Sequence, residues 1–439
     1  MTPARDRIAR FLSQPAVLPC SVLVGVMLRL FWIFTTAPEP VSDYEWYYRR
    51  AVGLVSGLGY QVDGRPTAFW PVGYPAFLAL VYLATGPSVL AGQLANVLLY
   101  AGIIWLLYSL AFVLFNSRFI AGTTAILLSV YPNHIAQTGL LSTETLFLFL
   151  SLLAIWLLLK ADQQTAAGAL SGLIFGLACL VKPQAIFLPC VVVAAHRFSD
   201  AGFRSTRHLF AVLICVYACL GVTLTPWLVR DYRVFNGFVF VSTNGGFNLL
   251  VGNNPGATGT YMSRDELPTS VQEAVKNARN EYEQDRIERR VALDYLLTAP
   301  VEALRLWPKK AWYLYRSDGD GFVWTMAGIA PSRETLRTFV WRGTQLNKLF
   351  YMAVIATFMC ALGALGVRLA RFWEPPSESV GLAVIAYFSL TYMFYFGDPR
   401  FHFPVMPWVI MTVAALAARV VEPATDSGRS GSPTRSESG

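Results

Sequence analysis

Long apolar runs separated by short polar turns dominate the hydrophobic pattern of the chain. A helix needs about 20 apolar residues to cross the hydrocarbon core of a bilayer. On this basis the pattern predicts an all-α integral membrane protein with about ten membrane-spanning helices. Their approximate ranges are 15–35, 88–115, 119–137, 142–160, 165–181, 184–196, 209–228, 346–368, 379–396 and 403–420.

The composition supports this assignment. Hydrophobic residues make up 55% of the 439 residues and charged residues only 14%, whereas a soluble domain carries about a quarter charged residues. This excludes a soluble multidomain protein, and the many aliphatic and aromatic side chains exclude disorder. The net charge of +8 is typical of cytoplasmic loops in a membrane protein and does not indicate nucleic acid.

The polar segments divide the chain into four parts. An N-terminal membrane module covers 1–228, an outer loop 229–345, and C-terminal membrane helices 346–420; we predict a disordered cytoplasmic tail at 421–439. The first module contains its own outer loop, at 36–87, for which we predict interfacial helices. It includes an apolar stretch broken by proline and glycine at 71–86, which we interpret as re-entrant or interfacial. We expect the second outer loop to be mostly helical.

Positive charges on the short loops predict the orientation. Most arginines and lysines outside the two long loops fall on one side if the N-terminus is cytoplasmic, and the opposite turns carry few. We therefore expect both termini inside and both long loops outside, in an inner or plasma membrane. The basic N-terminal segment and the apolar run after it predict an uncleaved first helix. The basic residues on the inner side are Arg5, Arg7, Arg10, Arg118, Lys160, Arg197, Arg204, Arg207, Arg368, Arg371 and Arg419.

Ionisable residues also collect at the outer ends of the predicted spans. Such groups are costly at membrane depth, so each needs a reason. Carboxylates and cations brought to one surface of an apolar bundle indicate a site for an anionic substrate carried by a lipid. These residues are Asp43, Glu45, Glu144, Lys182, Arg230, Asp398 and Arg400.

Asp43 is the first candidate catalytic residue. Ser42 and Glu45 have the spacing of a capping box, so a helix is predicted to begin here, and we assign Glu45 to the box. The helix presents Tyr44, Tyr47, Tyr48, Ala51 and Leu54 on one apolar face. A carboxylate held beside such a face at the membrane surface can serve as a general base, which is the role that we assign to Asp43.

Glu144 opens a predicted span and is the second candidate catalytic residue. It has an equally plausible structural explanation, as an acidic residue in a first turn capped by Ser142. Lys182, Arg230 and Arg400 are predicted to bind a phosphate group. Their structural alternatives are snorkelling to the interface for Lys182 and interfacial anchoring for the two arginines.

The remaining sequence patterns do not support a histidine metal site, nucleotide-driven transport or esterase chemistry. The four histidines lack metal-ligand spacing, and no Walker A loop or G-x-S-x-G elbow is present. His134 is more consistent with a satisfied interfacial histidine than with a catalyst. The six cysteines form no C-x-x-C pair, so structural disulfides are not expected.

Nine short motifs, in order along most of the chain, give the sequence a resemblance to a known family. It resembles the integral-membrane glycosyltransferases of the GT-C fold, in the bacterial branch related to protein O-mannosyltransferases and the lipid A aminoarabinose transferase. The motifs that carry this resemblance are Arg29, Asp43-x-x-x-Tyr47, Gly57-Leu58-Gly59-Tyr60, Trp70-Pro71-Val72-Gly73-Tyr74-Pro75, Ser142-Thr143-Glu144, Leu180-Val181-Lys182-Pro183, Thr225-Pro226-Trp227 through Tyr232, Gly252-Asn253-Asn254-Pro255 and Asp398-Pro399-Arg400-Phe401.

The resemblance implies an enzyme that transfers a hexose or pentose from a polyprenyl-phosphate donor during cell-envelope glycan biosynthesis. Asp43 occupies the position of the family's acidic residue that serves the acceptor. The family often has adjacent Asp-Glu there, whereas this chain separates Asp43 and Glu45 by Tyr44. We expect inversion at the anomeric carbon, and an acceptor hydroxyl on a glycan, lipid or protein. Tyr47, Tyr74 and His134 are further possible substrate-binding residues. No metal ligands are assigned, and some relatives use a divalent cation, so that cofactor stays open.

Two alternatives use the same features. The first is a transporter or flippase of a lipid-linked glycan, although the charges gather at one face rather than at the midplane. The second keeps the scaffold but moves a preassembled oligosaccharide, as a polymerase or ligase does.

Overall fold

The structure is a computed structural model that describes residues 3–161, 164–197, 205–372 and 377–421. Of the predicted tail at 421–439, all but Val421 lies outside these residues, as does Arg204 of the inner basic set. Within the described part, every element except one short hairpin is helical. The predicted all-α class is therefore confirmed.

Five helices are long and apolar enough to cross a membrane, and five more are apolar but shorter. The long ones are α2 (Val17–Thr36), α5 (Val89–Phe115), α8 (Thr143–Lys160), α11 (Thr206–Phe235) and α18 (Glu334–Phe372). The shorter ones are α4 (Gly73–Thr85), α6 (Arg118–Ser129), α9 (Thr165–Val181), α19 (Ser379–Phe394) and α20 (Met406–Val421). A multi-pass membrane protein follows, while the count of ten spans stays a prediction.

The other elements are short. They are α1 (Pro3–Leu12), α3 (Asp43–Val55), β1 (Gln61–Val62), β2 (Arg65–Pro66), α7 (Pro132–Thr138), η1 (Pro183–Phe187), α10 (Leu188–Arg197), α12 (Gly245–Gly252), η2 (Arg264–Glu266), α13 (Thr269–Lys276), α14 (Glu281–Thr298), α15 (Pro300–Arg305), α16 (Trp307–Tyr315), α17 (Asp320–Ala327) and η3 (Pro399–His402).

Two predicted spans are not single helices. The range 119–137 is divided into α6 and α7, because Pro132 cannot donate a backbone hydrogen bond and instead starts α7 at its first position. The range 184–196 begins as the 3₁₀ turn η1 and continues as the ten-residue α10. At 1.5 Å per residue, α10 reaches only about 15 Å, half of the hydrocarbon thickness.

The membrane bundle packs closely where small residues allow it. On α9, a Cβ atom added to Gly172 would lie 2.3 Å from the backbone oxygen of Val216, and one on Gly176 would lie 2.5 Å from Thr223. Both neighbours belong to α11, so α9 and α11 approach at backbone distance. The glycines spaced four apart in the sequence thus serve helix packing.

The first outer loop consists of two helices and a hairpin. The predicted helix begins at Asp43 and buries Tyr44, Tyr47 and Ala51. The predicted capping box does not form: Ser42 makes no cap hydrogen bond. Glu45 instead accepts a hydrogen bond from Arg49 one turn later, because both side chains are exposed on the same helix face. The predicted interfacial segment at 71–86 is the continuous helix α4, whose Pro75 is tolerated in the first turn.

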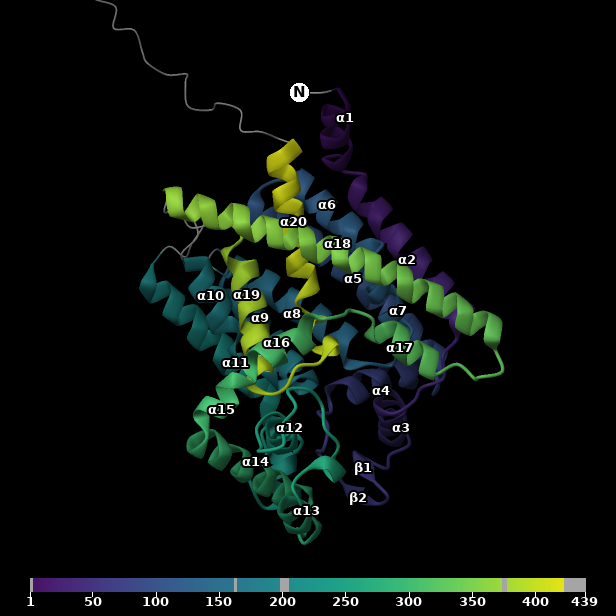
Figure 1. Cartoon of the computed structure of the whole chain (residues 1–439), viewed down its shortest axis with the longest axis vertical. Helices are drawn as coiled ribbons and strands as arrows, with labels where there is room; N and C mark the ends of the chain where they lie inside the picture. Colours follow the sequence, from purple (N-terminus) through teal and green to yellow (C-terminus); the bar gives the residue numbers. More distant parts are fainter. Residues whose placement is uncertain (1–2, 162–163, 198–204, 373–376, 422–439) are drawn as a thin grey trace, which may run out of the picture.

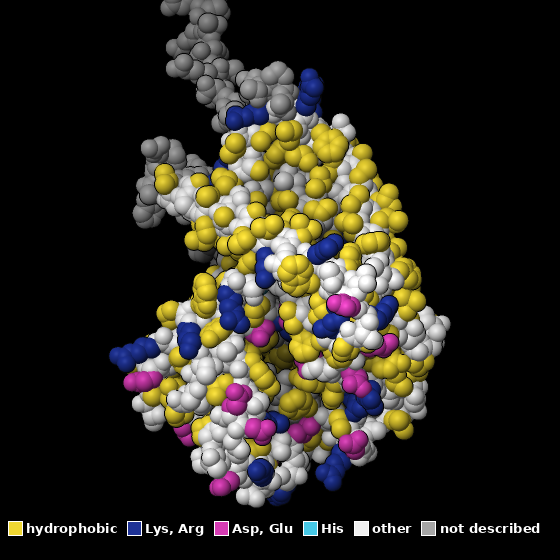
Figure 2. All heavy atoms as spheres, turned by 45° about the vertical axis from the view of Figure 1, so that its right-hand side comes forward, with side chains coloured by type: hydrophobic (Ala, Val, Ile, Leu, Met, Phe, Trp, Pro, Cys, Tyr) yellow, Lys and Arg dark blue, Asp and Glu magenta, His cyan; other side chains and the backbone are white. Residues whose placement is uncertain are grey.

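The first and last described helices lie at the opposite end of the molecule from the outer loops (Figure 1). Helix α1 and the last turn of α20 are at the top of the view, whereas α3, the hairpin and α12 to α14 are at the bottom. Figure 2 shows the upper part covered mainly by hydrophobic side chains, while most visible charged side chains gather over the lower part around a recess. This division is what a membrane-embedded bundle with large polar loops at one end requires.

Candidate active site

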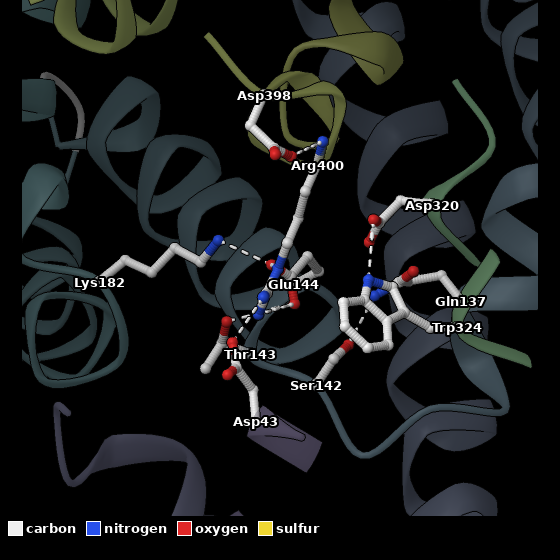
Figure 3. Close-up of polar contacts among 10 residues, drawn as sticks. All are labelled: Asp43, Gln137, Ser142, Thr143, Glu144, Lys182, Asp320, Trp324, Asp398 and Arg400. Atoms are coloured by element: carbon white, nitrogen blue, oxygen red, sulfur yellow. Dashed lines mark hydrogen bonds and ion pairs between the residues drawn. The ribbon is translucent and has the colours of Figure 1, made fainter. Parts of the chain in front are cut away.

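Four charged side chains from distant parts of the chain meet at the loop-bearing end of the bundle (Figure 3). Asp43 begins α3, Glu144 lies in the first turn of α8, Lys182 follows α9, and Arg400 lies in η3. We call these four residues the charge cluster. The sequence predicted each of them as a site residue, and the structure brings all four together.

Glu144 is the centre of the charge cluster. Its side chain is 1% exposed, and its Oε1 accepts hydrogen bonds from Arg400 Nε at 2.5 Å and Lys182 Nζ at 3.0 Å. Its Oε2 accepts from Thr143 Oγ1 at 3.2 Å and from the Arg400 terminal nitrogen NH2 at 3.4 Å. A buried carboxylate held by two cations does more than complement a helix terminus. The predicted Ser142 cap bond is also absent, since Ser142 Oγ accepts from Gln137 instead.

Arg400 links Glu144 to Asp43. Its NH1 group donates to Asp43 Oδ2 at 2.9 Å, and its backbone N–H donates to Asp398 Oδ1 at 2.9 Å, which fixes the turn of η3. Burial lowers the pKa of Arg400, but the charges of Glu144, Tyr44 and Asp43 raise it further, so the guanidinium keeps its charge. Asp43 is the most open member of the cluster, with 29% of its side chain exposed.

Lys182 reaches the cluster because the chain leaves helical geometry at this residue. Its backbone is extended (φ −143°, ψ 113°), as expected for a residue before proline. The side chain is only 11% exposed and bonds to Glu144, so the snorkelling alternative is wrong.

Asp320, in the second outer loop, was not recognised from the sequence. It starts α17, which packs on α7 because Gly321 allows backbone approach: a Cβ atom there would lie 2.7 Å from the Gln137 nitrogen. Its Oδ1 accepts from Trp324 Nε1 at 3.0 Å. Its Oδ2 is buried without a hydrogen-bond partner among the described residues. Burial raises the pKa of Asp320 to about 7, although Arg400 opposes this. The sole sequence signal is the alternation of acid and glycine in Asp318-Gly319-Asp320-Gly321.

Arg230 lies outside the charge cluster. It donates to the carbonyl oxygens of Thr67 and Tyr60 at 2.8 Å each, and to Asp231 at 2.7 Å. It therefore ties the end of α11 to the first outer loop, as the anchoring alternative proposed. Its predicted phosphate-binding role has no support from these contacts and stays a prediction.

Tyr47 and Tyr74 form an aromatic wall beneath Asp43. Both are buried, and their rings meet edge to face at a centroid distance of 5.7 Å. Trp70 packs on Tyr47 at 5.6 Å and continues this wall. The Tyr74 hydroxyl has no hydrogen-bond partner in the part of the chain that the structure describes.

His134 lies in the core, apart from the charge cluster. Its Nδ1 is hydrogen-bonded to the hydroxyl of Tyr100, and its ring stacks on Phe403 at 4.0 Å. Arg29 lies over the Tyr100 ring at 3.8 Å and donates to Ser129, so it is buried in the bundle and does not snorkel. His134 is fully buried and its Nε2 has no hydrogen-bond partner among the described residues, so the predicted satisfied interfacial histidine is wrong on both points.

A second buried polar network lies next to the charge cluster. Asp318 Oδ2 accepts from Tyr131 at 2.5 Å and Asp318 Oδ1 from Asn133 at 2.5 Å, while Asn347 donates to the Asp318 carbonyl oxygen. His402 Nε2 lies 3.2 Å from Asp318 Oδ1. We call these five residues the Asp318 network. Burial raises the pKa of Asp318, but the close approach and charge of His402 lower it further, so the net shift is downward.

The carboxylates of the site do not fit a divalent cation as they lie. Among the described residues, no three His, Cys, Asp or Glu side chains converge as a metal site. Glu144 uses its oxygens for cationic side chains, and Asp43 Oδ2 is used by Arg400. Binding a metal would require these ion pairs to open, so we derive no step through one.

Comparisons with known proteins support the fold. Residues 70–228 match the family model of dolichyl-phosphate-mannose-protein mannosyltransferase, which covers less than half of the chain. The structure is similar to the Archaeoglobus fulgidus oligosaccharyltransferase in complex with Zn and sulfate (TM-score 0.54, 18% identity, 92% of this chain and 49% of that one). It is also similar to the archaeal oligosaccharyltransferase AglB from the same organism, in complex with an inhibitory peptide and a dolichol-phosphate (TM-score 0.55, 15% identity, 92% and 50%).

A weaker similarity connects the chain to ArnT from Cupriavidus metallidurans bound to undecaprenyl phosphate (TM-score 0.44, 15% identity, 91% of this chain and 78% of that one). No curated protein sequence gives a match. The chain spans about half the length of the archaeal oligosaccharyltransferases that it resembles. Together, the family match and the archaeal structures confirm the predicted GT-C-like fold and the predicted resemblance.

Proposed function

We propose that this chain is a membrane glycosyltransferase that moves a sugar from a polyprenyl-phosphate donor to an acceptor hydroxyl. The observation that carries this proposal is the meeting of Asp43, Glu144, Lys182 and Arg400 at the loop-bearing end of a GT-C-like bundle. The similarity to AglB, whose structure contains a dolichol-phosphate, supports a lipid phosphate as the carrier. The sugar is a hexose or pentose, and the acceptor is a glycan, lipid or protein of the cell envelope.

Arg400 and Lys182 hold the donor phosphate in this proposal. Glu144 neutralises one of their two positive charges and fixes both side chains at hydrogen-bonding distance. Asp43 neutralises the other positive charge, so the N–H donors of Arg400 and Lys182 that are not used in these ion pairs bind the phosphate, whose negative charge grows as it leaves. Donors fixed in advance are effective at stabilising such charge because they need no rearrangement during the reaction. Glu144 is thus the residue that positions the two cations.

Asp43 is the proposed general base. It is the most exposed of the four residues and has one oxygen, Oδ1, outside the contact with Arg400. The acceptor oxygen attacks the anomeric carbon while its proton passes to Asp43. The bond from the anomeric carbon to the phosphate oxygen breaks, and the electron pair leaves with the polyprenyl phosphate. A single displacement from the opposite face inverts the anomeric centre.

The proposed reaction takes place on the extracytoplasmic side of an inner or plasma membrane. Helix α1 and the last turn of α20 lie at the opposite end of the molecule from α3, which begins with Asp43, and this is consistent with cytoplasmic termini (Figure 1). The basic residues of the short loops favour the same orientation. Membrane lipids surround the bundle and provide the route by which the polyprenyl chain arrives.

The substitution Asp43→Asn tests the base directly. We expect transfer by the purified full-length protein to fall by about 10²- to 10⁴-fold, the usual contribution of a general base. Glu45→Gln is the matched control, because Glu45 lies in the same helix turn but pairs with Arg49 at the surface. The assay supplies synthetic polyprenyl-phosphate sugars with an extract of envelope acceptors, and mass spectrometry reads the product.

Full activity of Asp43→Asn would remove Asp43 as the base. The same assay separates the alternative functions. A lipid-linked glycan that crosses proteoliposomes without any transfer would indicate a flippase, and addition of many sugars in one product would indicate a polymerase or ligase.

A further inference from the structure

Buried polar atoms without partners gather on one side of Arg400. Lys182 lies on the opposite side of Arg400 from Asp320, Trp324 and Gln137 (Figure 3). Asp320 Oδ2, Tyr44 Oη and Gln137 Oε1 are all buried, and none has a hydrogen-bond partner among the described residues. Tyr44 and Gln137 are each 1% exposed. Arg400 lies over the Tyr44 ring at 5.6 Å. An unsatisfied buried polar group costs about 1–3 kcal/mol, so three of them around Arg400 point to a polar ligand.

The same residues are held in place by contacts that leave these atoms available. Trp324 donates to Asp320 Oδ1 and meets the Tyr44 ring edge to face at 5.5 Å, so three side chains from two loops support one another. Gln137 donates a hydrogen bond from Nε2 to Ser142 Oγ, so Oε1 is the atom of its amide that has no partner among the described residues. The positions are therefore set in advance, as a binding site requires.

The chemistry of this group matches a neutral sugar. Asp320 Oδ2 and Gln137 Oε1 are acceptors for sugar hydroxyls. Burial raises the pKa of Tyr44 above its ordinary value, so its hydroxyl stays protonated and can also donate. Trp324 is half-buried beside them and adds an aromatic surface.

We infer that Tyr44, Gln137, Asp320 and Trp324 form the binding subsite for the donor sugar. We call these four residues the sugar subsite. The inference rests on the proposed function, because it assigns the phosphate of the same donor to Arg400 and Lys182. The sugar and its phosphate are joined by one glycosidic bond, and the sugar subsite adjoins Arg400 on the side away from Lys182, so one donor molecule can contact both.

Binding measurements on the purified full-length protein test this inference. The ligands are polyprenyl phosphate without sugar and the same lipid phosphate bearing a neutral hexose. At pH 8, above the raised pKa of Asp320, we expect Asp320→Asn to raise the Kd of the neutral donor by about 10- to 100-fold, which is what loss of a hydrogen bond to a charged group produces. The Kd of the bare lipid phosphate is expected to stay within about twofold. Tyr44→Phe, which keeps the ring and removes only the hydroxyl, is expected to give a smaller change in the same direction.

The substitution Asp294→Asn is the control, since it removes an exposed carboxylate from the same outer loop. Equal weakening of the bare and the sugar-bearing lipid by Asp320→Asn would show a structural role and overturn the subsite. Unchanged donor binding with a raised KM for the acceptor would also overturn it.

Failure of the proposed function would give a different result from failure of the sugar subsite. If the proposed function is wrong, the wild-type protein neither binds nor uses any of the lipid-linked sugars, whichever residue is changed. A wild type that transfers sugar and an Asp320→Asn variant that binds the neutral donor normally would refute the sugar subsite alone.

Discussion

The same two chain segments contribute to two neighbouring polar networks that differ in one respect. Asp318 and His402 belong to the Asp318 network, while Asp320 and Arg400, two residues away in each segment, face the charge cluster. In the first network, both oxygens of the Asp318 carboxylate have partners. Around the second, Asp320 Oδ2 and several other buried polar atoms have none within the described ranges.

This difference distinguishes a network that holds the structure together from a site that can bind a substrate. The side-chain amides of Asn133 and Asn347 are also fully used: Asn133 Oδ1 accepts from Gly321 and Asn347 Oδ1 accepts from the Asn133 nitrogen. Among the described residues, His402 Nε2 lies 3.2 Å from Asp318 Oδ1 without a hydrogen bond, but the other side-chain polar atoms of the network are hydrogen-bonded. A buried network with nearly all of its hydrogen bonds made rigidifies its surroundings. Here it fastens the second outer loop and η3 to α7, and it thereby sets the positions of Asp320 and Arg400. The neighbouring site keeps unsatisfied groups that a substrate can engage.

The largest effect on stability is expected from breaking the Asp318 network. Asp318→Asn places an amide opposite the donors of Tyr131 and Asn133 and removes the charge beside His402. We expect a loss of about 3–5 kcal/mol in the free energy of unfolding, as for other buried charged networks with one partner removed. Thermal unfolding in detergent measures it, with Asp294→Asn as the control. A variant as stable as the wild type would show that this network does not hold the loop.

The next effect is on catalysis with little loss of stability. Arg400→Lys keeps the positive charge but cannot contact Glu144 and Asp43 with a planar fork of donors. We expect transfer to fall by about 10²- to 10³-fold, comparable to removal of one preorganised donor. The unfolding temperature is expected to fall less than in Asp318→Asn. Arg316→Lys, at an exposed position of the second outer loop, is the matched control. If Arg400→Lys proved the less stable of the two variants, the distinction between the networks would be lost.

A smaller effect concerns pH. Because burial raises the pKa of Asp320 from an ordinary 3.8 to about 7, the folded protein retains this proton to higher pH than the unfolded chain does. Stability from this group is therefore complete below pH 4 and declines as the pH rises towards 7. We expect the wild-type unfolding temperature to fall by roughly 2–4 °C over this interval relative to Asp320→Asn. Parallel pH profiles for the two proteins would contradict the raised pKa.

The smallest effect is expected from chelation of divalent cations. The carboxylates of the charge cluster are engaged by Arg400 and Lys182, so we expect EDTA to change transfer by less than about twofold. The assay compares EDTA-treated protein with and without added Mg²⁺, Mn²⁺ or Zn²⁺. A tenfold loss that one of these ions restores would show that the ion pairs open to bind a metal.

The site could be predicted from the sequence in part. Apolar run lengths place Asp43, Glu144 and Lys182 at the ends of elements, and topology then brings helix ends to one surface. The same reasoning placed Arg230 in the site, although its donors are used by the first outer loop. It missed Asp320, because a residue inside a long outer loop has no membrane boundary to locate it.

Local sequence patterns predicted the helices more accurately than they predicted side-chain contacts. The helix starting at Asp43 was predicted together with its buried tyrosine face. The predicted capping box did not form, because Glu45 accepts a hydrogen bond from Arg49 instead. Pro132 similarly ended a predicted span early. Competition between nearby partners of similar energy decides such details, and the sequence alone does not rank them.

The sequence by itself determined the all-helical membrane architecture, the two long polar loops and the gathering of ionisable residues at one end. The physical reason is that the cost of placing polar groups in hydrocarbon depends on residue type and run length, which are local properties. Only the tertiary structure decided that Glu144 pairs with Arg400, 256 residues away, and that Asp320 adjoins them. Those pairings depend on how α7, α17 and η3 pack together, and packing is a property of the whole chain.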